Sequence, residues 1–159
     1  MIRIIRKAAA QDRQAVRDLL GQLGYAFTVE DVEDRLNLLA GTGTDPVLLA
    51  IRDDDIVGLI ALHFAIILHA REPVARVTAL VVRDEERGAG LGRLLVDAGD
   101  DLARQAGCSV LELTTAVART EAHTFYRKLG FTNSSLRFSR AIRSHLAVQV
   151  CSRPAGCQR

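Results

Sequence analysis

Three glycines at alternate positions, Gly88, Gly90 and Gly92, separate a cluster of charged residues from a helical run. Glycine inside a regular element costs about 0.5–1 kcal/mol relative to alanine, so three of them at the start of a helix need a reason. The first turn of a helix presents unpaired N–H groups and the positive end of the helix dipole. An anion can approach these groups where side chains are missing. With Arg87 and Arg93 flanking the glycines, the stretch predicts a phosphate or diphosphate site.

Two other phosphate-binding motifs do not fit this stretch. A dinucleotide fingerprint needs glycine at the sixth position counted from Gly88, where the chain has Arg93. A Walker loop needs Gly-Lys followed by Ser or Thr, and that triplet does not occur in the sequence. The glycines by themselves would also suit a tight strand-to-helix connection with close packing, so the spacing leaves both interpretations open.

The elements on either side of the glycines indicate how they are positioned. A strand ends at Val82, and apolar residues at helical spacing predict a helix over 91–106 that ends at Gly107. A further strand is expected over 109–115. A crossover that contains one helix normally joins two parallel strands of one sheet. We therefore expect the strand before the glycine stretch and the strand after the helix to lie parallel in one sheet.

The rest of the chain predicts an antiparallel meander and further helices. Other strands are expected over 2–6, 46–52, 56–69 and 76–82, with an Asp-rich turn at 53–55 and a last hairpin that begins at Phe131 and includes 136–142. Other helices are expected over 11–23, from an N-cap at Thr28 to Gly41, and over 120–129 before Gly130. The pattern predicts an α/β (α+β) mixed sheet with helices on both faces, in a single domain over 1–150. Residues 151–159 are expected to be a loosely ordered tail, with an extra strand or an anion-binding strip as alternatives.

Composition narrows the class of protein. The chain has 159 residues, 48% of them hydrophobic, and a net charge of +2 with acids interleaved among arginines, which argues against a nucleic-acid surface. Three cysteines, at 108, 151 and 157, without metal-ligand spacing indicate free thiols, a reducing compartment and no metal site. The most apolar run, over 56–70, contains two histidines and is too short to span a membrane. We therefore expect a cytoplasmic protein without a membrane segment.

Two motifs, in this order along the chain, resemble the core of the GCN5-related N-acetyltransferase (GNAT) superfamily. The first is Arg87-Gly88-Ala89-Gly90-Leu91-Gly92 after a strand that reads Leu80-Val81-Val82. The second is Ala122-His123-Thr124-Phe125-Tyr126-Arg127-Lys128-Leu129-Gly130-Phe131. The resemblance covers about residues 77–131, and it implies the family's fold: a mostly antiparallel mixed sheet with a splayed central parallel pair and about four helices.

The resemblance also implies acetyl-CoA, or another short acyl-CoA, as cosubstrate. In the family the signature loop binds the CoA diphosphate through backbone N–H groups, which here are those of Gly88, Ala89, Gly90, Leu91, Gly92 and Arg93, with Arg87 opening the loop. The pantetheine arm pairs with the preceding strand, here Leu80, Val81 and Val82. The family often has an asparagine seven residues before its tyrosine; this chain has Arg119 there, which would reach a CoA phosphate or an acidic acceptor, or else point to solvent.

The implied reaction is attack of a primary amine on a thioester. It needs an uncharged amine, a donor for the oxyanion and a proton for the leaving thiolate. Tyr126 matches the family's tyrosine at the CoA sulfur, and a phenol is protonated at neutral pH, so it is the expected general acid. Many family members have a glutamate on the strand before the signature, but residues 76–80 contain no carboxylate. Glu112, which is flanked by apolar residues, is therefore the leading catalytic base or amine-binding group.

Other assignments of the proton acceptor stay open at this level. His63, His123 and ordered water are the alternatives to Glu112. The acceptor is unidentified, and Tyr25 and Phe27 are expected near it because the first two helices of the family cover the acceptor site. A homodimer is expected because dimers are common in the family. A noncatalytic acyl-CoA-binding or sensory module on the same fold is the alternative function, favoured only by the missing strand glutamate.

Overall fold

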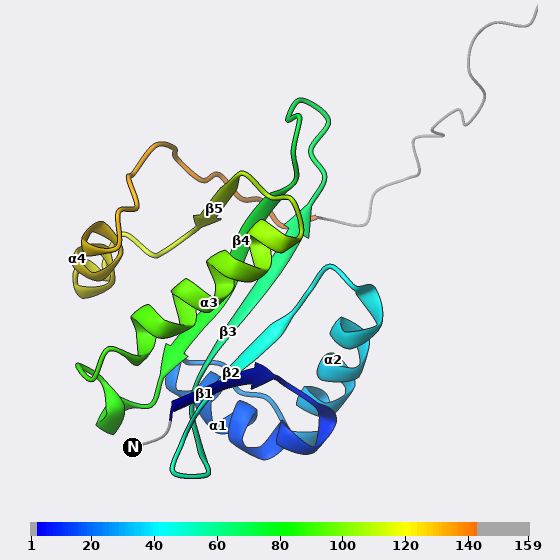
Figure 1. The fold of residues 1–159 in the computed structure, drawn as a ribbon, viewed down its shortest axis with the longest axis vertical. Coiled ribbons are helices and arrows are strands. Elements are labelled where there is room, and N and C mark those ends of the chain that lie inside the picture. The colour runs from blue at the N-terminus through cyan, green and yellow to red at the C-terminus, as the bar shows by residue number, and fades with distance from the viewer. Residues whose placement is uncertain (1–2, 143–159) are drawn as a thin grey trace, which may run out of the picture.

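The computed structural model describes residues 3–142 of the chain (Figure 1). The predicted tail over 151–159, the end of the predicted domain at 150, and the cysteines at 151 and 157 lie outside the described residues. Within residues 3–142, no helix is long and apolar enough to cross a bilayer. Cys108 is half-buried and forms no disulfide.

One five-stranded mixed sheet organises the described residues, with strands in the order β1-β2-β3-β4-β5. The strands are β1 (Arg3–Lys7), β2 (Val47–Arg52), β3 (Asp55–Ala65), β4 (Val74–Val82) and β5 (Val110–Leu113). The helices are α1 (Arg13–Gln22), α2 (Val29–Thr42), α3 (Leu91–Gln105) and α4 (Thr120–Lys128), with short 3-10 turns at Ala10–Asp12 and Asp84–Glu86. The first four strands pair antiparallel, and β4 pairs parallel with β5 through the crossover helix α3. The predicted mixed fold with a central parallel pair is confirmed.

Alternation along the strands places one half of the core on each face of the sheet. On β3, Leu59 packs with the side chains of α1 and α2, whereas Ile60 packs with those of α3. The helix α3 lies along the sheet over β3 and β4, and α4 lies at the left of the view, on the side of α3 away from α1 and α2 (Figure 1). This two-sided coverage explains why β2 and β3 are apolar at consecutive positions rather than at every second position.

Local sequence signals set several element boundaries as expected. Thr28 is the N-cap of α2: its hydroxyl accepts from the Asp31 N–H at 3.1 Å, and its own N–H donates to the Asp31 carboxylate at 3.0 Å. The turn between β2 and β3 contains Asp53 and Asp54 at φ +50° and +69°. Two central residues with positive φ are what a tight antiparallel hairpin favours.

Two of the predicted element ends are wrong. The helix α2 does not end at Gly41; it continues to Thr42 and ends at Gly43, which has the left-handed conformation at φ +72° that a helix terminus favours. The strand predicted over 56–69 ends at Ala65, and its expected continuation Ile66 is 92% exposed. Beyond Ala65 the neighbouring chain turns away into α2, so no ladder partner remains and apolar character alone does not extend the strand.

The predicted last hairpin is also absent where the structure describes the chain. Residues 132–142 follow α4 without forming a strand. The side chains that suggested it, Leu136, Phe138 and Ile142, are 84–99% exposed. Alternation of apolar residues predicts which side chains would share a face, but a strand forms only where a sheet edge offers its backbone a partner.

Candidate active site

The segment that follows β4 is fixed to the rest of the molecule before the glycine loop begins. The backbone N–H of Arg83 donates to the carbonyl of Val57 at 2.8 Å, and its guanidinium donates to the carbonyl of Ile56 at 2.7 Å. Arg52 of β2 forms an ion pair with Glu86 in the 3-10 turn. These contacts hold the start of the loop against β2 and β3, so the loop that follows has a defined origin.

The three glycines of the loop serve two different structural purposes. Gly88 and Gly90 have φ of +79° and +81°, and no atom lies within 4 Å of the position of an added Cβ at Gly88. Gly90 is the N-cap of α3, and it offers no side chain to the N–H groups of the first turn. Gly92 is helical instead, and an added Cβ would lie 3.1 Å from the ring of Phe125 on α4. The open approach to the backbone and the close packing of α3 on α4 therefore coexist in one motif.

Two arginines add positive charge to the loop, but each also has an acidic neighbour. Arg87 forms an ion pair with Asp84 at 2.6 Å, and Arg93 lies 3.9 Å from Asp97 one turn along α3. Both guanidinium groups are more than half exposed. Exposed pairs of this kind are worth little energetically, so the arginines remain able to change partners when an anion arrives.

The parallel strands β4 and β5 part beyond their fourth residue pair. Their register runs from Val74 opposite Val110 to Val77 opposite Leu113, and no strand of the described chain pairs with β4 on this side after that. A β-bulge at Thr78, where the register with β3 shifts, bends β4 at the same place. The predicted splay is confirmed, and it leaves the backbone groups of residues 78–82 open on the β5 side.

A cleft of about 110 Å³ occupies the space that the splay opens. Residues 77–80 of β4 form one wall and residues 113–115 at the end of β5 form the other, with Tyr25, Arg119 and Tyr126 around them. The hydroxyl oxygen of Thr115 is buried and has no hydrogen-bond partner among the described residues. A buried polar atom without a partner is uncommon, and it marks this wall as a surface prepared for a polar ligand.

Tyr126 of α4 lies at the cleft in an environment that keeps its phenol protonated. Its ring packs edge-on against Phe125 and Phe131, with centroid distances of 5.2 and 5.7 Å. Burial raises the pKa of Tyr126, and the charge of Arg119 only partly opposes this rise. Because a raised pKa favours the neutral form, the hydroxyl of Tyr126 is able to donate a proton near neutral pH.

The structure places Glu112 beside the cleft rather than in its lining. Glu112 lies opposite Arg76 in the β4–β5 register, and both the Nε and Nη2 atoms of Arg76 donate to its Oε1 atom, at 2.8 and 2.5 Å. Its side chain is 40% exposed, and its Oε2 atom receives no hydrogen bond from the described residues. Glu112 is thus a carboxylate with one oxygen held and the other available.

The predicted cofactor residues on β4 differ in how they are placed. Leu80 lines the cleft and also packs against the core cluster on the α3 side. Val81 is buried in the core under α1 and α2, and Val82 packs toward α3, so both can reach a ligand only through their backbone. Arg119, just before α4, is exposed and lines the cleft.

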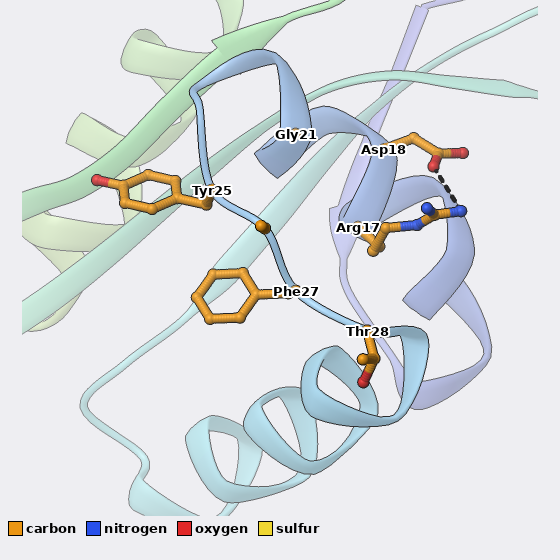
Figure 2. Close-up of a pocket in the computed structure, with 7 residues that line it drawn as sticks. Arg17, Asp18, Gly21, Tyr25, Phe27 and Thr28 are labelled. Carbon is orange, nitrogen blue, oxygen red and sulfur yellow. Dashed lines mark ion pairs between the residues drawn. The ribbon is translucent and has the colours of Figure 1, made fainter.

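A second, larger hollow of about 500 Å³ lies beside the cleft (Figure 2). It is formed by α1 and the connection to α2, with Arg17, Asp18, Tyr25 and Phe27 among its lining residues. Figure 2 shows the ring of Tyr25 turned away from Arg17, and Tyr25 also lines the cleft between β4 and β5. The two spaces therefore meet at Tyr25.

Sequence reasoning missed several residues that this region brings together. It assigned nothing to Thr78, Thr115 or Arg76, although Arg76 and Thr78 are the polar members of an otherwise apolar strand. That polarity was the available signal, because a polar residue on an interior strand requires a partner or a cavity. Thr115 offered no comparable signal, since its burial depends on how β5 leaves the sheet.

Comparisons with known proteins agree with this geometry. The model of a family described as the acetyltransferase (GNAT) family matches residues 13–131. The aminoalkylphosphonate N-acetyltransferase of Salmonella typhimurium is 37% identical over 94 residues, which are 59% of this chain and 61% of that protein. The match therefore spans less than two thirds of that relative's length.

Solved structures show the same fold at low sequence identity. Glucosamine-6-phosphate N-acetyltransferase from Arabidopsis thaliana is similar with a TM-score of 0.77 and 23% identity, over 90% of this chain and 100% of that one. The aminoglycoside N-acetyltransferase AAC(6')-Iy in complex with CoA is similar with a TM-score of 0.81 and 16% identity, over 90% and 96% of the two chains.

Proposed function

Because this chain belongs to the acetyltransferase (GNAT) family, we propose that it transfers an acetyl group from acetyl-CoA to a primary amine. The observation that carries the proposal is the cleft between the parted strands β4 and β5, which is lined by Tyr126 and by the strand that leads to the glycine loop. Bound acetyl-CoA would supply the acetyl thioester, and the chain would supply the binding groups and the proton donor.

The donor would be held mostly by backbone groups. The N–H groups of Gly88 to Arg93, together with the start of α3, would bind the diphosphate, with Arg87 and Arg93 adding charge. The open edge of β4 from Leu80 to Val82 would pair with the amides of the pantetheine arm, as an added strand would. The unpartnered hydroxyl of Thr115 and the guanidinium of Arg119 on the facing wall suit the same polar ligand.

Tyr126 would act as general acid. Its hydroxyl lies at the cleft, and its raised pKa keeps the proton available for the leaving sulfur. Glu112 would hold the amine: its Oε2 atom is open to accept a hydrogen bond from the ammonium group of the acceptor, while Arg76 fixes the other oxygen. A charge-assisted hydrogen bond of this kind would orient the amine toward the cleft.

The acceptor would enter from the hollow beside α1. Tyr25 belongs to both spaces, so an amine bound next to Tyr25 and Phe27 would face the end of the cleft. Arg17, which lines the hollow, suits an acceptor that carries an anionic group at its far end. Aminoalkylphosphonates, on which the Salmonella typhimurium relative acts by name, are the first acceptors to try.

The test is release of free thiol from acetyl-CoA with a panel of primary amines that begins with aminomethylphosphonate. Turnover by the wild-type protein, lowered roughly 100-fold or more in Tyr126→Phe, is expected, since general acid catalysis contributes about 100- to 10,000-fold. Calorimetry should show unchanged CoA binding in that variant. CoA binding without turnover of any amine would instead favour the noncatalytic acyl-CoA-binding module.

A further inference from the structure

Four polar side chains form a row across the sheet beside the cleft. They are Asp45, just before β2; His63 of β3; Arg76 of β4; and Glu112 of β5. His63 lies opposite Arg76 in the β3–β4 register, and Arg76 lies opposite Glu112 in the β4–β5 register. Directly opposed residues in a sheet share a face, so these side chains are neighbours.

Asp45 extends the row although it precedes β2. Backbone N–H groups of Leu62 and Phe64 donate to carbonyls on either side of Asp45, at 3.0 and 2.8 Å. These two bonds place Asp45 directly opposite His63. The side chains meet there, with the Nδ1 atom of His63 at 2.7 Å from the Asp45 carboxylate.

The row lies next to the end of the cleft that faces away from the glycine loop. Leu59 of β3 packs under α1 and α2, and His63, four residues on, points to the same face. Arg76 immediately precedes Val77, the first β4 residue of the cleft lining. A donor whose diphosphate binds beyond Val82 and whose arm follows β4 would bring its acyl end toward this row.

Among the described residues of this region, His63 is the group best arranged to accept a proton. Glu112 accepts two hydrogen bonds from Arg76 at Oε1, and its Oε2 atom is the one proposed to hold the amine. His123 lies on α4, outside the row, where its Nε2 atom donates to the carbonyl of Ala116 at 3.0 Å. The ring of His63 is 44% exposed, and no other hydrogen bond to it is formed within residues 3–142.

The Asp45 contact fixes which nitrogen of His63 is free. Burial alone would raise the pKa of Asp45, but hydrogen bonds from Thr42, Thr44 and His63 lower it below its ordinary value, so Asp45 is a carboxylate that can only accept. The Nδ1 atom of His63 must therefore carry the donated hydrogen. In the neutral ring this leaves a lone pair on Nε2, the form that a general base requires.

We propose that His63, oriented by Asp45, takes the proton that the acceptor's ammonium group must lose before it reacts. This inference rests on the proposed acetyl transfer. The Nε2 atom takes one proton, the uncharged nitrogen bonds to the acetyl carbon, and the carbon–sulfur bond breaks. The leaving sulfur takes the proton of the Tyr126 hydroxyl, and Tyr126 then takes a proton from the nitrogen of the new amide. His63 finally releases its proton to water. The charged groups that face His63 are Asp45 and, across β4, Arg76, with Glu112 beyond it.

The experiment compares the pH dependence of kcat/KM in the wild type, His63→Gln, Asp45→Asn and the control His69→Gln. His69 lies exposed in the loop after β3 and belongs to neither cleft nor row. The amine is aminomethylphosphonate or, if that is inert, the fastest amine of the panel above. CoA affinity and the thermal midpoint are measured for every variant, so that a folding or donor-binding defect is recognised.

The expected result for His63→Gln is a fall in kcat of about 100-fold or more, loss of the acid-side decline of the pH profile, and unchanged CoA affinity. Asp45→Asn should lose part of the rate, and added imidazole should partly restore a His63→Ala variant. If His63→Gln stays active and its rate declines at low pH as the wild type's does, His63 is not the base, although the proposed acetyl transfer is unaffected. A wild-type protein that acetylates no amine of the panel would overturn both.

Discussion

Replacing Gly90 by alanine tests whether the entry into α3 depends on a left-handed backbone. Gly90 has φ +81°, a left-handed backbone conformation that L-residues rarely adopt. An L-residue in this region costs about 1–2 kcal/mol in the backbone. For a chain of this size that lowers the thermal midpoint by roughly 2–8 °C.

Gly41 provides the matched control. It lies inside α2, has nothing within 4 Å of an added Cβ, and has no positive φ. The same chemical change there should stabilise the protein by roughly 0.5–1 kcal/mol, because alanine is the better helix former. The two variants are therefore expected to move the midpoint in opposite directions.

The assay is thermal unfolding of both variants and the wild type, followed by calorimetric titration with CoA. Asparagine at position 90, which tolerates the left-handed region, should recover part of the lost stability. CoA affinity should fall in both position-90 variants, since a side chain would enter the approach to the diphosphate. Equal midpoints for Gly90→Ala and Gly41→Ala would refute the conformational reasoning, whatever happens to CoA binding.

Three further substitutions test the scaffold. The Arg6 guanidinium lowers the pKa of Asp12, so the ion pair stabilises the folded protein fully above the ordinary pKa of 3.8, and this stabilisation is lost as pH falls through the lowered pKa. Arg6→Met should therefore lower the free energy of unfolding in urea by about 1–3 kcal/mol at neutral pH, and the difference from the wild type should shrink in acid. Asp54→Gly should raise the free energy of unfolding in urea by roughly 0.5–1 kcal/mol, because glycine adopts the φ of +69° without strain, and a lower free energy of unfolding would contradict this. Gly58→Ala should lower the free energy of unfolding by about 1–3 kcal/mol, seen as a lower thermal midpoint, because its Cβ would lie 3.0 Å from the rigid carbonyl oxygen of Val81. An unchanged midpoint would show that the strands move apart to accommodate the methyl group.

The prediction of the strand, helix and strand around the glycine loop succeeded because it needed only local signals. The run of glycines before Leu91, the apolar stripe of α3 and the strand that ends at Val82 are contiguous in the chain. Crossover handedness and length rules then specify how such a strand, helix and strand must sit in one sheet. The parallel pair followed from that order, and its splay was implied by the family resemblance. The roles given to the individual loop residues stay predictions.

Signals that depend on a distant partner gave wrong or incomplete answers. The alternation at Leu136 and Phe138 predicted a strand, but those residues are exposed and no strand forms there. Likewise, the sequence showed no carboxylate near the catalytic part of β4, yet the β4–β5 register places Glu112 directly beside Arg76.

The sequence by itself predicted the four helices and the five strands that form, where the glycine loop interrupts them, and that Tyr126 and the loop belong to one motif pair, but it also predicted a last hairpin that does not form. Only the tertiary structure decided that Asp45, His63, Arg76 and Glu112 stand in one row. These four residues come from four separate segments, and their contacts arise from inter-strand register. Register is a property of how the whole sheet assembles, so no window of the sequence contains it.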